Sequence, residues 1–78
     1  MNRIVASLQR IFDTENIAQA NLIVSILAAK GIHPPRLRTV PRFTPVGVEI
    51  LYAIEVPVEQ VAAADAVLRP YGYIGRVG

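Results

Sequence analysis

The fold is decided by two stretches, IAQANLIVSILAAKG at residues 17–31 and VEILYAIEV at residues 48–56. In the first, apolar residues recur at helical spacing up to Lys30, and Gly31 suits the left-handed residue that ends many helices. In the second, one set of alternate residues is entirely apolar, which predicts a strand with one buried face. A chain that contains both patterns is expected to fold as an α+β domain.

Weaker patterns on either side of these stretches supply the remaining elements. Residues 4–12 have apolar side chains at both odd and even positions, which is typical of a central strand covered on both faces. The polar residues 13–16 predict a turn into the helix, with Asn16 or alternatively Thr14 as its N-cap. Pro34-Pro35 cannot donate hydrogen bonds to a sheet, so the extended segment that continues through residues 36–38 is predicted to lie at a sheet edge.

The second half of the chain is divided by prolines and glycines. Pro41, Pro45 and Gly47 predict a loop over Thr39–Gly47. A second helix is expected over Glu59–Leu68, because the proline at position 70 disfavours helix in the residue before it.

The order of elements predicts the fold class. It is that of a ferredoxin-like βαββα(β) sandwich, in which an antiparallel sheet has two helices on one face. We expect residues 1–78 to form a single domain with its core at about residues 3–69, and residues 70–78 to form a short final strand or a flexible tail.

Hydrophobic residues make up 53% of this 78-residue chain, more than the usual ~45–50% of a soluble domain. A small chain cannot bury such a proportion alone. The predicted first helix has two apolar stripes, whereas covering a sheet needs only one. We therefore expect a homo-oligomer, with a dimer favoured, whose interface includes Leu22, Ile26 and Ala29 of this helix or, alternatively, exposed surface of the sheet. A different protein partner is the alternative.

Three arginines form the sharpest polar cluster. The net charge is +2, and all but one of the eight basic residues are arginine, which favours bidentate contacts with carboxylates or phosphates. Arg36 and Arg38 share one face of the predicted edge strand, and Arg42 follows in the predicted loop. The three could bind a small anion. Alternatively, their charges protect an edge strand from unwanted pairing.

Composition excludes several classes of protein. The chain has no cysteine, so it has neither disulfides nor a thiolate metal site, which is compatible with the cytoplasm. The longest uncharged run with a helical pattern, residues 16–29, is shorter than the ~20 apolar residues of a membrane span. We expect a soluble, cytoplasmic protein that does not enter a membrane.

Catalytic and nucleic-acid functions have little support in the sequence. The single histidine, His33, lies beside two prolines, and neither Ser7 nor Ser25 is placed to form a triad with it. Glu49 and Glu55 lie too far apart along one strand to share a metal ion. RNA-binding sheets need exposed aromatic rings on their central strands. The strand predicted over residues 48–56 has Glu49 and Leu51 at the positions where such rings would lie. We expect no catalytic residues, no metal and no cofactor, and we do not expect nucleic-acid binding.

A set of apolar and turn residues between about Arg10 and Leu68 forms a further pattern: Ile11-Phe12-Asp13-Thr14, Ile17, Ala20, Leu22-Ile23, Ile26-Leu27, Gly31-Ile32, Glu49-Ile50 and Val56-Pro57. This pattern resembles that of a family of short bacterial proteins described as prokaryotic signal transducing proteins. That family is similar in fold to the nitrogen-regulatory PII proteins, which are ferredoxin-like, oligomeric and ligand-sensing. The resemblance implies a regulatory role, with Thr39–Gly47 at the position of the PII effector loop, but it transfers no functional residue.

Two hypotheses for function follow. The first is a small non-catalytic regulatory or protein-interaction module that takes part in signal transduction. The second is a sensor of a small anionic ligand bound by Arg36, Arg38 and Arg42.

Overall fold

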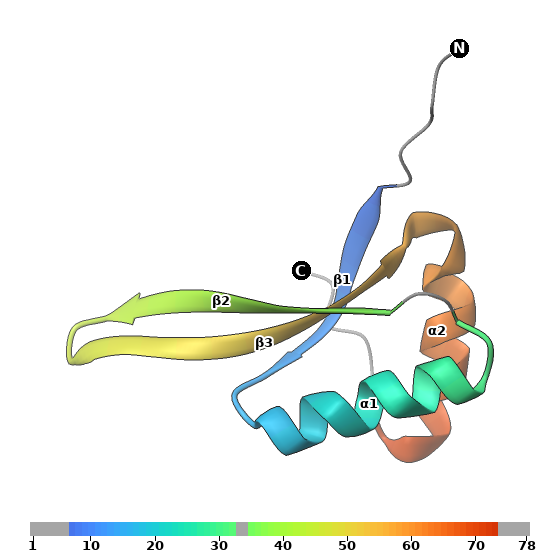
Figure 1. Ribbon diagram of the computed structural model, residues 1–78, viewed down its shortest axis with the longest axis horizontal. Coiled ribbons are helices and arrows are strands. Elements are labelled where there is room, and N and C mark those ends of the chain that lie inside the picture. The colour runs from blue at the N-terminus through green and yellow to red at the C-terminus, as the bar shows by residue number, and fades with distance from the viewer. Residues whose placement is uncertain (1–6, 33–34, 74–78) are drawn as a thin grey trace, which may run out of the picture.

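A computed structural model describes residues 7–32 and 35–73 and shows an α+β fold (Figure 1). Its three strands form an antiparallel sheet in the order β1-β3-β2. Two helices pack against this sheet, and a short 3₁₀ turn flanks each end of the second. In chain order the elements are β1 (Leu8–Thr14), α1 (Ile17–Ala29), β2 (Arg36–Thr44), β3 (Gly47–Pro57) and α2 (Val61–Leu68), with 3₁₀ turns at Val58–Gln60 and Arg69–Tyr71.

Both ends of α1 follow the prediction. The side-chain oxygen of Asn16 accepts hydrogen bonds from the backbone N–H groups of Ala18, at 2.9 Å, and Gln19, at 3.2 Å, so Asn16 is the N-cap. Gly31 follows the helix with a φ of +85°, a conformation that is unstrained only for glycine. The chain then turns back, because the N–H of Ile32 donates to the carbonyl of Leu27 at 3.0 Å.

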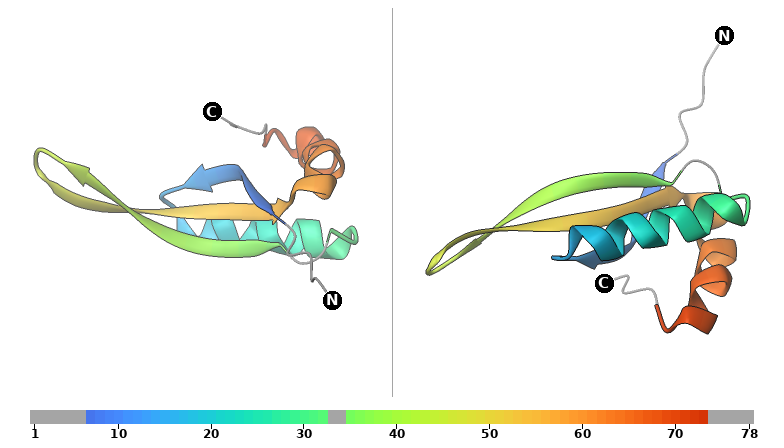
Figure 2. Two further views of the ribbon diagram at one scale, coloured as in Figure 1. Left: turned by 90° about the horizontal axis from the view of Figure 1, so that it is seen from above. Right: turned by 60° about the horizontal axis from the view of Figure 1, so that its bottom comes forward.

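Residues from both helices share one core with β1 and β3 (Figure 2). Ile54 and Val56, two residues apart on β3, point to the same face of the sheet and are fully buried. We call this face the core face. The buried cluster consists of Ile11, Ala20, Ile23, Leu27, Ile32, Ile54, Val56, Ala64 and Leu68.

β1 differs from the prediction in position and in the reason for its apolar pattern. It covers Leu8–Thr14, so it extends beyond residue 12, and residues 4–6 lie outside the described part of the chain. The pairing of β1 with β3 shifts between Arg10 and Phe12, which is a β-bulge at Ile11. The bulge lets the consecutive residues Ile11 and Phe12 both pack into the core. The apolar residues at both parities therefore reflect this bulge and not a strand covered on two faces.

The predicted loop over Thr39–Gly47 is wrong. β2 continues to Thr44, and only Pro45 and Val46 connect it to β3, with Thr44 paired to Gly47. The hydroxyl of Thr44 donates to the carbonyl of Gly47 at 2.9 Å and accepts from the N–H of Val46 at 3.3 Å. Pro41 is tolerated inside β2 because β2 lies at an edge of the sheet, as predicted.

The C-terminal part agrees with the predicted second helix to within one turn, since the helix over Val61–Leu68 is preceded by a 3₁₀ turn. Of the predicted final strand, residues 74–78 lie outside the described residues, and the ring of Tyr73 meets that of Phe12 edge-on at 5.5 Å. Across residues 7–32 and 35–73, neither helix has the length and apolar character needed to cross a membrane.

Candidate functional site

The pairing of β2 with β3 places Arg36, Arg38 and Arg42 on one face of the sheet. They lie opposite Glu55, Ala53 and Glu49 of β3, respectively. These positions alternate with Ile54 and Val56, so the arginines point away from the core face. We call this second face the open face.

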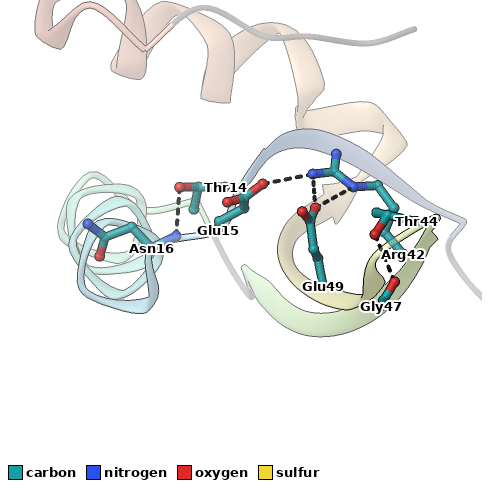
Figure 3. Close-up of polar contacts among 7 residues, drawn as sticks. All are labelled: Thr14, Glu15, Asn16, Arg42, Thr44, Gly47 and Glu49. Atoms are coloured by element: carbon teal, nitrogen blue, oxygen red, sulfur yellow. Dashed lines mark hydrogen bonds and ion pairs between the residues drawn. The ribbon is translucent and has the colours of Figure 1, made fainter.

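Arg42 is already bound to two carboxylates (Figure 3). Its Nε donates to Oε1 of Glu49 at 3.0 Å, and its Nη2 contacts the same oxygen. Nη2 also donates to Oε2 of Glu15, which follows β1, at 2.7 Å. The hydrogen bond with Glu49, helped by the charges of Glu49 and Glu15, raises the pKa of Arg42 above its usual value. Arg42 therefore stays charged and ties the β2–β3 hairpin to the segment between β1 and α1.

Arg36 and Arg38 lie in a different part of the open face. Arg38 pairs with Glu55 at 3.5 Å, and the Glu55 side chain is only 13% exposed. Glu55 is paired with Arg36 of β2 on one side and with Arg10 of β1 on the other. Arg10 pairs with Asp13 at 3.5 Å, whereas Arg36 makes no ion pair with the residues that the structure describes.

The structure therefore separates the predicted cluster into two groups. Arg38 and Arg42 are four residues apart on one strand, which corresponds to roughly 13 Å along the chain. Arg36 and Arg38 instead share the surroundings of Glu55 with Arg10, a residue that the sequence analysis did not single out. The signal for Arg10 is the strand pairing, which no pattern within β1 reveals.

The predicted interface residues lie on α1 with different degrees of exposure. Leu22 is 50% exposed and Ala29 is exposed, but Ile26 is half-buried against the core. The exposed surface of α1, which we call the outer face of α1, has no charged residue. Its residues are Ile17, Ala18, Asn21, Leu22, Ser25, Ala28 and Ala29.

A second exposed apolar surface lies on the sheet, which the sequence analysis named as an alternative interface without assigning residues to it. At the far end of the β2–β3 hairpin, Phe43 is 79% exposed, Val48 57% and Ile50 44%. The two turn residues are Pro45 and Val46, and Val46 is 92% exposed. The alternation of apolar residues in β3 was the available signal for this surface. The predicted loop over Thr39–Gly47 concealed it, because Val48 would then have begun a strand and would not have lain within a two-stranded ribbon.

The described residues contain no group of three or more His, Cys, Asp or Glu side chains that could hold a metal ion. His33 lies outside the described residues. A hollow of about 360 Å³ lies at the C-terminal ends of α1 and α2. Lys30 is the charged residue of its lining, which otherwise consists of Ala66, Val67, Pro70 and Tyr71.

Comparison with known proteins adds no relative to this description. No protein-family model, curated protein or solved structure matches the chain.

Proposed function

We propose that this protein is a small, non-catalytic interaction module that acts as a homodimer, with the outer face of α1 as part of its contact surface. A ferredoxin-like arrangement and the resemblance to prokaryotic signal transducing proteins belong to this proposal. The element order βαββα and the strand order β1-β3-β2 support the ferredoxin-like arrangement. The role in signal transduction is proposed from the resemblance of sequence.

The observation behind the proposal is the uncharged outer face of α1. An exposed helix face on a monomer usually has charged side chains, because charged groups are strongly hydrated. Cores of protein–protein interfaces are instead depleted of charged residues. Leu22, at 50% exposed, lies among small and uncharged neighbours on this face. The outer face of α1 has the composition of an interface.

A charge placed on this face should separate the subunits. We expect the wild-type protein to have twice its 8.5 kDa chain mass in sedimentation equilibrium at tens of micromolar. Leu22→Glu should weaken association at least tenfold, about 1.4 kcal/mol, because the carboxylate would be desolvated without a partner. Ala63→Glu, at an exposed position of α2, adds the same charge elsewhere and should leave the dimer intact. A wild-type protein with the mass of one chain at this concentration would contradict the proposal.

A second candidate function is the sensing of a small anion on the open face. The observation that favours it is the position of Arg10, Arg36 and Arg38 around Glu55, with Arg36 exposed and without an ion pair among the described residues. A phosphate or carboxylate ligand would gain charge-assisted hydrogen bonds from these guanidinium groups. Arg42 is not part of this site, because Glu15 and Glu49 already bind it.

Binding of inorganic pyrophosphate, measured by calorimetry at low salt, tests this candidate. The variant Arg36→Ala should bind at least tenfold more weakly than the wild type while melting at the same temperature, because Arg36 has no ion pair among the described residues. Arg42→Ala is the matched control, since it removes one positive charge from the same strand, and it should retain binding to within about twofold. An equal loss of affinity for pyrophosphate in both variants would contradict the site and indicate a general effect of charge. If the wild type does not bind pyrophosphate, the arginines only protect the sheet edge from pairing.

A further inference from the structure

The far part of the β2–β3 hairpin is a ribbon of two strands. β1 makes its last pair between Thr14 and Tyr52, so within residues 7–32 and 35–73 no third strand pairs with residues 40–51. We call these residues the arm, which extends past the N-terminal end of α1 (Figures 1 and 2). The Cα radius of gyration is 13.4 Å, whereas a compact chain of this length would have about 11.5 Å.

One side of the arm is an uncovered continuation of the core face. Val48 and Ile50 share their face of β3 with Tyr52 and with the buried residues Ile54 and Val56. Phe43 pairs with Val48, and Pro41 pairs with Ile50, so β2 adds apolar groups to the same side. The helices of the chain cover this face near Ile54 and leave it exposed along the arm.

An isolated two-stranded ribbon is marginally stable in water, so an arm with this apolar side is expected to pack against another surface. The core face of β3 is covered by α1 and α2 within the subunit. The surface best suited to cover the arm is therefore another helix with an exposed apolar face.

We infer that the apolar side of the arm, formed by Phe43, Val48 and Ile50, packs on the outer face of α1 of a second copy, and that the contact is reciprocal. This inference rests on the proposed function, because it names the surfaces through which the dimer forms. A two-fold dimer gives each subunit both roles, since its arm covers the partner's helix while its own helix is covered.

The available area favours a reciprocal contact. A standard interface buries about 800 Å² on each partner. From their exposed fractions, the apolar residues of the arm offer on the order of a few hundred Å², the size at which such patches become uncommon on monomers. Neither the arm nor the outer face of α1 is large enough alone, but the two together on each subunit approach the standard area. Both are also without charge on the sides that would meet.

Contact through side chains, and not through strand edges, is consistent with the residues of β2. Pro41 lacks the N–H that an added strand would need, and Arg36, Arg38 and Arg42 place charges along this edge strand. Both features discourage the edge-to-edge pairing of sheets. The apolar side of the arm has no such protection.

Cross-linking between single-cysteine variants tests the inference, because the chain has no cysteine of its own. Val48→Cys places a thiol on the apolar side of the arm, and Ser25→Cys places one on the outer face of α1. Both substitutions are close in size and keep Phe43 and Leu22. The two variants, one of them with an affinity tag, are mixed, allowed to exchange subunits and treated with a short bis-maleimide.

We expect a cross-linked heterodimer in the mixture, at least tenfold more abundant than in a matched mixture of Val48→Cys with Ala63→Cys, whose thiol lies on α2. A second helix variant, Ala18→Cys, replaces Ser25→Cys if that position fails to react. Efficient cross-linking of Val48→Cys to itself would overturn the inference, because it would show the two arms packed on each other. Absence of heterodimer at both helix positions in a protein with the mass of a dimer would overturn it too, while the proposed function survives. A wild-type mass of one chain would overturn both.

Discussion

The substitution Leu27→Ala is expected to unfold most of the protein at 25 °C. Leu27 is fully buried at the centre of the cluster formed by α1, α2 and β3. Removing three carbon atoms there costs about 2–5 kcal/mol, since the lost burial adds to the cavity left behind. A single-core domain of this size is held by only ~3–5 kcal/mol. One cavity is therefore comparable with the entire stability of the fold.

Urea denaturation followed by far-ultraviolet circular dichroism measures this effect. The variant should lack most of the helical signal without urea, or show a midpoint far below that of the wild type. Leu8→Ala makes the same change at a leucine that is 39% exposed on β1, and it should cost less than about 1 kcal/mol. A Leu27→Ala protein with an unchanged midpoint would show that α1 does not depend on this core.

The second large effect is expected from Ala64→Leu, which enlarges a fully buried alanine of α2. Ala64 belongs to the buried cluster with Ala20, Ile23 and Leu27 of α1. A larger side chain at this closely packed position forces the helices apart or strains rotamers, at a cost of about 1–3 kcal/mol.

Ala63→Leu is the matched control for this prediction, because it makes the same change at the adjacent, exposed position. Its free energy of unfolding should stay within about 0.5 kcal/mol of the wild-type value. Equal stability of the two variants would mean that the core has room for the added methyl groups beside Ala64, which the full burial of this residue argues against.

Helix α1 and strand β3 could be predicted from the sequence because their signals are local. Asn16 and Gly31 mark the ends of α1 through contacts within a few residues, and the alternation in VEILYAIEV gives β3 one apolar face, which is buried at Ile54 and Val56 and exposed at Val48 and Ile50. The pattern of β1 was misread because a bulge and a two-sided strand produce the same mixture of apolar residues. Only the pairing with β3 distinguishes them, and this pairing joins distant parts of the chain.

The arm could not be predicted from the turn residues alone. Pro41, Pro45 and Gly47 within seven positions indicate a loop when each is taken as a breaker of structure. In the structure Pro41 lies in an edge strand, Pro45 in the turn, and Gly47 begins β3 with a φ of +141°. The same three residues are therefore compatible with a continuous hairpin, and their meaning depends on the position of β2 at the edge of the sheet.

Arg36 and Arg38 were predicted to share a face of a strand, with Arg42 in a loop, whereas the strand pairing places all three on the open face of β2. Their division into two groups was not predictable, because it depends on the carboxylates of Glu15, Glu49 and Glu55. Glu15 reaches Arg42 from a distant segment of the chain, and no spacing within β2 reveals this contact. Whether any of these arginines binds an anion stays a prediction.

The strand order also has a consequence for the path of folding. β2 and β3 are joined by only two residues, Pro45 and Val46, so their hairpin can close within microseconds of collapse. β1 pairs with β3, which follows it in the chain only after α1 and β2. Closing this larger loop costs more entropy than closing the hairpin. During synthesis β1 is therefore made first and pairs last. Ile11 and Phe12 therefore stay exposed to water until β3 has left the ribosome. The nascent chain is most prone to aggregate during this interval.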